Sequence, residues 1–223
     1  MIDHVLYISS WYPQARKSNG TFIEMQLIAA GEAGVKAAVL QTEVLTAGNY
    51  LRKRLRGESL FNYRPHEQVY AVENLAVHRL PLRYSTNPDR AGAAAVISAA
   101  LRNAGNYMRE HGRPDAFFHH GIFDFCYLTA ALSEHFDIPY WFMEHSAFVD
   151  EGTLKSRNAF ESESDLRDFV IGASRRFAVT GAYARRFSRM FDVPFEFAPN
   201  VLSSDFFAKS PELRSHPPFT FLN

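Results

Sequence analysis

Val5-Leu6-Tyr7-Ile8, followed by Ser9-Ser10, is a short apolar run that contains branched side chains. Such a run is typical of a strand buried on both faces, as in a parallel sheet. From Phe22 onward the apolar residues recur at helical spacing, and Gly34 favours a helix end. Val35–Leu40 then predicts a second strand. A strand, a helix and a second strand in this order form the βαβ unit of doubly wound sheets.

The same alternation continues along the chain, where segments of strand length are followed by segments of helical spacing. The further predicted elements are a helix at Arg90–His111, a strand at Ala116–His119, a helix at Phe123–Phe136, a strand at Tyr140–Met143, a helix ending near Ala173, a strand at Phe177–Val179, a helix at Ala182–Met190 and a strand at Phe195–Phe197. These repeated pairs predict an α/β, Rossmann-like domain with a mainly parallel sheet and helices on both faces.

The alternation is interrupted between Thr42 and His66, where neither a helical nor a strand period is visible. Two short strand-like runs follow, Val69–Val72 and Leu75–Leu80, separated by two turn residues. This pattern predicts a hairpin inserted into the α/β series near residues 68–82.

The composition argues against several classes of function. Lysine plus arginine equals aspartate plus glutamate, at 24 each, so no overall charge favours a nucleic-acid partner. The single cysteine, Cys126, excludes an internal disulfide, fits a reducing cytoplasm, and is expected to be buried within a helix, away from the helix start. Because the sequence also lacks a G-x-S-x-G motif, hydrolases with a serine or cysteine nucleophile are disfavoured.

The N-terminal residues lack the basic start and apolar run of a secretory signal, and no stretch approaches the roughly 20 apolar residues of a membrane span. We therefore expect a soluble, cytoplasmic protein. One basic cluster could contact anionic lipid headgroups and make the protein peripheral at the inner face of the membrane. It consists of Arg52, Lys53, Arg54 and Arg56. The same cluster is compatible with an ordinary solvated face.

Ligands of an open parallel sheet bind beyond the carboxyl ends of the strands, so the loops after the strands contain the candidate site. The loop after the first strand carries Trp11 and ends in Asn19-Gly20-Thr21 at the start of a helix. Gly20 lets the backbone approach a ligand closely, and the free N–H groups of a helix N-terminus attract anions. The loop therefore predicts a phosphate site. The other interpretation is that Gly20 only allows a turn in the chain.

Two further strands, which are expected to be neighbours in the sheet, end in polar residues. Ala116–His119 is followed by His120-Gly121, and Tyr140–Met143 is followed by Glu144-His145. Histidine titrates near neutral pH, and a nearby glutamate can fix which ring nitrogen carries the proton. These residues predict a proton-transfer or hydrogen-bonding site, with structural histidines as the other interpretation. No metal is expected, because nothing in the sequence brings three of these side chains together.

Ordered segments along the whole chain resemble one protein family. The segments are Ile8–Pro13, Asn19–Ile23 with Gln26, Pro114–Gly121, Ile138–Tyr140 with Glu144–Ser146, Ala198–Val201 with Asp205–Phe207, and Phe219–Asn223. In this order they resemble the N-terminal, acceptor-side domain of the group 1, or family 4, retaining glycosyltransferases, whose two facing Rossmann-like domains form the GT-B fold. The chain departs from the family at Phe118, where many relatives carry a histidine.

The resemblance implies a role for each matching residue. Asn19-Gly20-Thr21 would approach the diphosphate and sugar of the donor. His120 would be the catalytic residue near the transferred sugar, where it positions or polarises and does not act as a nucleophile. The acceptor side would be lined by Trp11, Gly121, Glu144 and His145.

The resemblance also implies a division of the chain. Residues 1–216 would form the acceptor-side domain, and residues 217–223 would begin a C-terminal donor-binding domain. The basic pair and the Glu-x(7)-Glu motif of the family belong to that second domain. We therefore expect the chain to be part of a longer transferase and to be inactive alone.

The implied reaction transfers a sugar, with retention, from a UDP- or GDP-linked donor to a hydroxyl of a sugar or lipid-linked acceptor, as in cell-surface polysaccharide biosynthesis. No metal or other cofactor is implied, because helix dipoles and basic side chains would stabilise the departing diphosphate. Two other functions stay open: a non-catalytic Rossmann-like module that binds an anion or a partner protein, and an epimerase-type domain. The missing G-x-G-x-x-G fingerprint after the first strand argues against the epimerase.

Overall fold

The structure is a computed structural model that describes residues 2–9, 21–45, 55, 68–72, 75–79, 82–85, 90–122, 125–145 and 162–201. These residues form β1 (His4–Ser9), α1 (Thr21–Glu32), β2 (Lys36–Leu45), β3 (Gln68–Val72), β4 (Leu75–Arg79), β5 (Leu82–Ser85), α3 (Arg90–His111), β6 (Ala116–His120), α4 (Cys126–Phe136), β7 (Tyr140–Glu144), α5 (Glu163–Gly172), β8 (Arg175–Ala178), α6 (Gly181–Phe191) and β9 (Glu196–Phe197). The order of strands and helices follows the predicted alternation with two differences. β5 was not predicted, and β2 continues to Leu45, into the segment from Thr42 where no strand period is visible.

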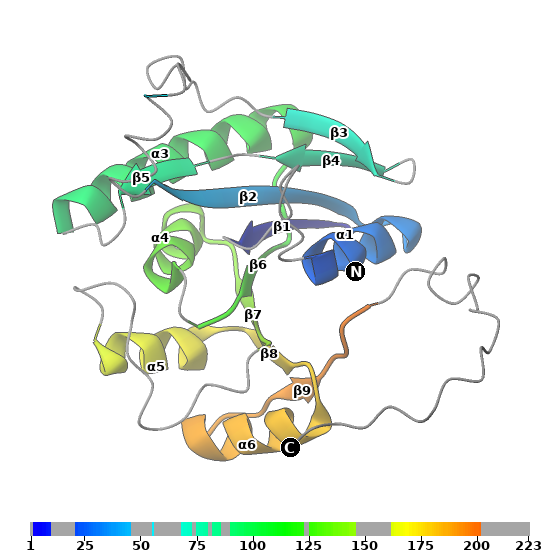
Figure 1. Cartoon of the computed structure of the whole chain (residues 1–223), viewed down its shortest axis with the longest axis vertical. Helices are drawn as coiled ribbons and strands as arrows, with labels where there is room; N and C mark the ends of the chain where they lie inside the picture. The colour runs from blue at the N-terminus through cyan, green and yellow to red at the C-terminus, as the bar shows by residue number, and fades with distance from the viewer. Residues whose placement is uncertain are drawn as a thin grey trace.

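The described strands form one sheet in the order β3-β4-β2-β1-β6-β7-β8-β9, and β5 also pairs with β2 (Figure 1). Every pairing is parallel except the one between β3 and β4. The prediction of a Rossmann-like, mainly parallel sheet is therefore confirmed.

The hairpin region lies at one edge of this sheet. β3 and β4 pair antiparallel, with Val72 opposite Leu75. β4 also pairs in parallel with β2, through Ala38 and His78. The hairpin thus extends the main sheet.

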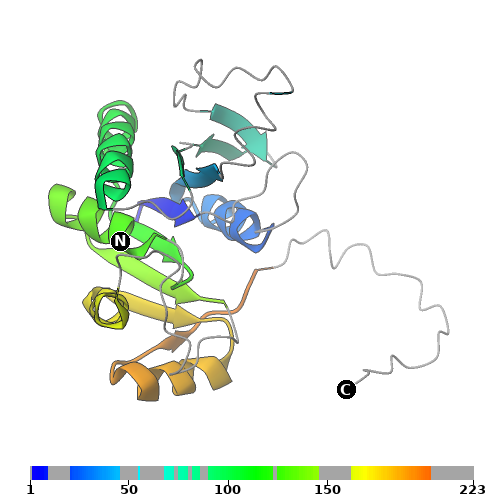
Figure 2. The same cartoon turned by 60° about the vertical axis from the view of Figure 1, so that its left-hand side comes forward.

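Alternating side chains of β1 face two different layers. Leu6 and Ile8 belong to the larger core cluster, together with buried residues of α3, α4, α5 and α6. Val5 and Tyr7 belong to a smaller cluster on the other face, where they pack with Ile23 and other residues of α1. Figure 2 shows α1 on one side of the sheet and α3, α4 and α5 on the other. Helices therefore cover both faces, as expected for this fold class.

The order of the strands reverses between β1 and β6. The chain goes from β1 to β2 on one side, whereas β6, β7, β8 and β9 follow one another on the other side. In doubly wound sheets, ligands bind beyond the strand ends at such a switch point. The carboxyl ends of β1 and β6 are Ser9 and His120. A ligand site is therefore expected around His120.

The start of α4 differs from the prediction. The helix was expected to begin near Phe123 with Cys126 inside it, but Cys126 is the first residue of α4. The cause is Phe125, whose φ of 66° is left-handed and therefore incompatible with a continuous right-handed helix through this residue. Cys126 is buried, as expected, with 2% of its surface exposed. Its thiol donates to the carbonyl oxygen of Ile122 at 3.1 Å.

Within the part of the chain that the structure describes, no helix is long and apolar enough to cross a membrane.

The core position of β6 can be tested by truncation. Phe117 has no exposed surface, so Phe117→Ala should lower the free energy of unfolding by about 3–5 kcal/mol through lost burial and a residual cavity. Urea denaturation followed by circular dichroism measures this change. The matched control is Phe197→Ala in β9, where the ring is 59% exposed and the change should stay below about 0.5 kcal/mol. Equal losses in the two variants would contradict the placement of β6 in the core.

Candidate functional site

Two histidines meet at the carboxyl ends of β6 and β7. Nδ1 of His120 lies 2.8 Å from Nε2 of His145, so one ring donates a hydrogen bond to the other. His120 is buried, with 3% of its surface exposed. Among the described residues, its Nε2 atom has no hydrogen-bond partner. A buried polar atom without a partner is costly, and such atoms are often explained by an absent ligand or water.

Both rings of this pair are neutral near pH 7. Burial lowers the pKa of His120 well below its ordinary value, and the nearby His145 and His119 lower it further. Burial also lowers the pKa of His145 to about 4, which a hydrogen-bonding contribution from the Asn200 side chain partly opposes. A neutral pair that shares one hydrogen bond presents one N–H and one lone pair at its two outer nitrogens. His120 can therefore accept or donate a hydrogen bond at Nε2, depending on the tautomer.

His119 points to the opposite face of the sheet and has a structural role. Its Nε2 lies 2.9 Å from the carbonyl oxygen of Gly121, and its Nδ1 lies 2.7 Å from the hydroxyl of Thr129. Because a carbonyl oxygen only accepts, Nε2 carries the proton and Nδ1 accepts from Thr129. Burial lowers the pKa of His119 to about 4. Both nitrogens are used internally, although Cys126 Sγ also approaches Nε2 at 3.7 Å.

Glu144 was expected to line the acceptor side, and the structure shows a buried carboxylate that binds backbone. Its Oε2 accepts a hydrogen bond from the N–H of Ile122 at 2.8 Å. Its Oε1 accepts from the N–H of His145 at 2.9 Å. Only 2% of Glu144 is exposed. The carboxylate therefore joins the segment after β6 to the end of β7.

Gly121 connects His120 to this segment. Its φ of 83° lies in the left-handed region, which favours glycine, and its N–H donates to the carbonyl oxygen of Met143 at 2.9 Å. The glycine thus turns the chain directly after His120 while keeping a backbone bond to β7. This role explains the residue type without a ligand contact.

Aromatic rings surround the histidine pair. Tyr7 stacks on His120 with ring centroids 5.6 Å apart, and Phe118 lies 4.6 Å from the same ring. Phe22, in the first turn of α1, lies 4.3 Å from the ring of His145. These contacts place the N-terminus of α1 beside the pair.

The expected phosphate loop is described only at its last residue. Thr21 is the first residue of α1 and is exposed. Trp11, Asn19 and Gly20 lie outside the described residues, as does the basic cluster Arg52, Lys53, Arg54 and Arg56. Residues 202–223 also lie outside them, including the segment 217–223 assigned to a second domain. Within the described part, the site thus consists of His120, His145, Glu144 and the start of α1.

No group of three or more histidine, cysteine, aspartate or glutamate side chains in the described residues could hold a metal ion. Glu144 and His119 use their polar atoms for internal hydrogen bonds, which leaves only the His120–His145 pair.

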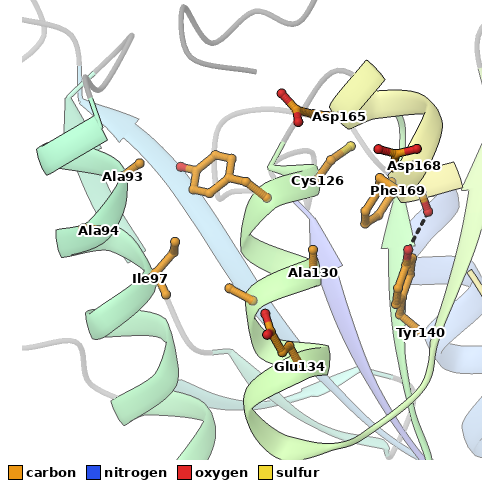
Figure 3. A pocket seen from close by; sticks show the side chains of 12 residues that line it. Ala93, Ala94, Ile97, Cys126, Ala130, Glu134, Tyr140, Asp165, Asp168 and Phe169 are labelled. Carbon is orange, nitrogen blue, oxygen red and sulfur yellow. Dashed lines mark hydrogen bonds between the residues drawn. The ribbon is translucent and has the colours of Figure 1, made fainter. Parts of the chain in front are cut away.

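A groove of about 660 Å³ lies between the helices α3, α4 and α5 (Figure 3). Its walls combine alanines of α3 and α4 with three carboxylates, those of Glu134, Asp165 and Asp168. Negative charge of this kind disfavours a phosphate group, so the groove is a poorer match to the predicted anion site than the strand ends are.

Sequence reasoning missed several residues that contact the three histidines. Tyr7 and Phe22 were assigned to the core or to a helix start, and Thr129 was not singled out. A period of two along β1 and β6 puts Tyr7, Phe118 and His120 on one face of the sheet, and this signal could have identified Tyr7. The contact of Phe22 depends on the rotation of α1 and has no local signal.

No protein-family model matches this sequence, and no curated protein matches it. Solved structures do match the fold. A trehalose-6-phosphate protein from E. coli, bound with UDP-2-fluoro glucose, aligns with a TM-score of 0.55 and 10% identity over 93% of this chain and 51% of its own. An alpha,alpha-trehalose-phosphate synthase (UDP-forming) from Burkholderia vietnamiensis aligns with a TM-score of 0.55 and 14% identity over 94% of this chain and 50% of its own.

The N-terminal domain of a Candida albicans trehalose-6-phosphate phosphatase also aligns, with a TM-score of 0.53 and 13% identity, over 96% of this chain and 52% of its own. The chain thus spans about half the length of these structures. Identities this low show the fold alone. The fold is Rossmann-like and corresponds to one half of the GT-B architecture.

The buried histidines predict a loss of stability in acid. The pKa of His145 is about 4 in the folded protein, against an ordinary value of 6.5, so between these values the unfolded chain binds more protons. The stabilisation linked to this group is complete above pH 6.5 and falls as the pH drops toward 4. In urea titrations across this range, His145→Gln should reduce the slope of unfolding free energy against pH by at most about 1.4 kcal/mol per unit.

The reference for this experiment is the wild-type protein, measured in urea over the same pH range. A slope that is the same in His145→Gln and in the wild type would contradict the buried, neutral state of His145.

Proposed function

We propose that this chain is the acceptor-side half of a glycosyltransferase that moves a sugar from a nucleotide-sugar donor to a hydroxyl group of an acceptor. The observation that carries the proposal is the buried His120–His145 pair, which lies at the switch point of a GT-B half with its His120 Nε2 atom unpaired among the described residues. A ligand at the strand ends would give this nitrogen its missing partner.

His120 acts in this proposal by hydrogen bonding to the transferred sugar. The ring is neutral, so it contributes a directed N–H or lone pair and no positive charge. His145 hydrogen-bonds to the ring, Glu144 binds the backbone N–H of His145, and Tyr7 and Phe118 pack against the ring. A preorganised group of this kind accelerates a reaction because it does not have to reorient as charge develops.

The diphosphate needs a different partner. The N-terminus of α1 is the positive end of the helix dipole, and it lies beside the pair through the contact of Phe22 with His145. In the proposal, the loop Asn19-Gly20-Thr21 binds the donor diphosphate there. Further contacts come from a second, donor-binding domain, as the match to only half of the similar structures suggests.

The finer features of the proposal rest on the family resemblance. They are membership of group 1, or family 4, retention at the transferred carbon, a UDP- or GDP-linked donor, the absence of a metal, a sugar or lipid-linked acceptor, and a cytoplasmic reaction in cell-surface polysaccharide synthesis. The similar E. coli structure holds UDP-2-fluoro glucose, which supports a nucleotide-sugar donor. Arg52, Lys53, Arg54 and Arg56 would provide the contact with a membrane surface.

The central experiment removes the unpaired imidazole. In the full-length protein, His120→Ala should lower kcat by roughly 10²–10³-fold, the effect of losing one preorganised hydrogen-bonding group. Transfer is measured with a panel of nucleotide sugars, after circular dichroism has shown that the variant folds. His135→Ala, at an exposed position of α4, is the matched control and should retain full activity. A folded His120→Ala variant with normal turnover would reject the proposed role.

A second experiment tests whether sugar transfer requires the proposed second domain. The isolated chain of 223 residues should show no sugar transfer in a coupled assay, because most donor contacts would belong to the second domain. Turnover by the isolated chain would reject this division. Absence of transfer by the full-length protein with every donor would instead favour a non-catalytic module that binds an anion or a partner.

A further inference from the structure

A separate pocket lies between the sheet and α1. Its volume is about 220 Å³. The walls come from four neighbouring strands, from α1 and from the segment after β9. They are formed by Tyr7, Gln26, Phe118, Trp141, Met143, Phe177, Ala198, Pro199 and Val201. Neither the sequence analysis nor the proposed function assigned a ligand to any of these residues.

Aromatic rings form the floor of the pocket. Phe118 packs edge to face against both Trp141 and Phe177, with ring centroids 5.9 Å apart in each case. The guanidinium of Arg175 lies over the rings of Trp141 and Phe177, at 5.6 and 4.9 Å from their centroids. These contacts hold the rings in place, so the apolar floor is fixed before a ligand arrives.

One polar atom in the pocket is unpaired. Gln26 is 8% exposed, and its amide Nε2 donates to the sulfur of Met143 at 3.4 Å. A thioether has no hydrogen to donate, so the NH₂ group faces the sulfur and the amide oxygen faces away from it. This oxygen, Oε1, has no hydrogen-bond partner among the described residues. It is available to a ligand that donates a hydrogen bond.

The size and lining of the pocket define the ligand. An apolar cavity of about 150 Å³ is known to hold benzene, so this pocket has room for one six-membered ring with small substituents. The walls are mainly aromatic and aliphatic, and they offer one unpaired acceptor. An unmodified hexose would leave most of its hydroxyls without partners there.

We propose that this pocket binds a single, mostly apolar ring that carries one hydrogen-bond donor, with the ring packed on Phe118, Trp141 and Phe177 and the donor bonded to Gln26 Oε1. The binding does not depend on the proposed transferase function. Tyr7 and Phe118 line this pocket and also pack on His120, so a bound ring is next to the histidine pair.

The test uses two probes that differ by one hydroxyl group, 4-fluorophenol and fluorobenzene. Each is titrated into the purified chain of 223 residues, in the absence of any nucleotide sugar, and binding is followed by fluorine NMR of the probe. 4-Fluorophenol should bind saturably and roughly three- to tenfold more tightly than fluorobenzene, which is the effect of one hydrogen bond. Glucose should not displace it.

Variants separate the two parts of the pocket. Gln26→Met keeps the length of the side chain but removes the acceptor, so the two probes should bind equally. Phe177→Ala removes part of the floor and should weaken both probes. Its matched control is Phe197→Ala, where the ring is 59% exposed and outside the pocket, and binding should be unchanged.

The proposal is overturned if folded wild-type protein shows no saturable binding of 4-fluorophenol. It is also overturned if the preference for 4-fluorophenol persists in Gln26→Met, or if glucose competes. All of these results are independent of the transfer assay with His120→Ala, so a failure of this proposal can be told apart from a failure of the proposed function.

Discussion

The carboxylate of Glu144 determines the arrangement of the strand ends. A carboxylate with 2% exposure would be very unfavourable without partners, but here each oxygen accepts a backbone N–H, from Ile122 and from His145. These bonds tie the segment after β6 to the end of β7. The side chains that follow from those ends are therefore held close to one another, and the 2.8 Å contact between His120 and His145 depends on this arrangement.

The parallel register then decides which histidine takes part. His120 pairs with Met143, and His119 pairs with Phe142, so consecutive histidines point to opposite faces of the sheet. His120 meets His145, which lies two residues beyond Met143 and hence on the same face. A slip of one residue in β6 would bring His119 to this position and bury His120 under α4. The core residue Phe117 opposes such a slip, because its side chain would leave the larger core cluster for the other face of the sheet.

Much of this organisation is visible in the sequence because it depends on local patterns. The apolar run Val5–Ile8 lies within β1, and the expected strand Tyr140–Met143 differs from β7 by one residue. The prediction that His120 and His145 end neighbouring strands follows from the same alternation, and the two strands do pair. The start of α4 was predicted wrongly because the left-handed backbone of Phe125 has no signal in a residue type that rarely adopts it.

The partners of the site residues were harder to predict, for a physical reason. Glu144 looked like a ligand-facing residue, and the turn at Gly121 brings the backbone N–H of Ile122 to its carboxylate. Gln26 of α1 donates to Met143 of β7, 117 residues further along the chain, and this contact depends on how α1 is rotated against the strands. Periodicity gives the face of an element, but not the distance between side chains on two elements.

The neutrality of the histidine pair limits how this site could bind the anionic donor of the proposed function. Burial prevents His120 and His145 from holding a positive charge at pH 7, so the pair cannot attract a diphosphate by Coulomb forces. In the proposed function, attraction would have to come from the dipole of α1 and from positive charges that are not part of the pair. The pair instead supplies one directed hydrogen bond at a fixed position. A sugar hydroxyl can be its partner in either tautomer, whereas a phosphate oxygen can only accept. In the proposed function, recognition of the sugar and recognition of the diphosphate would therefore fall to different parts of the fold.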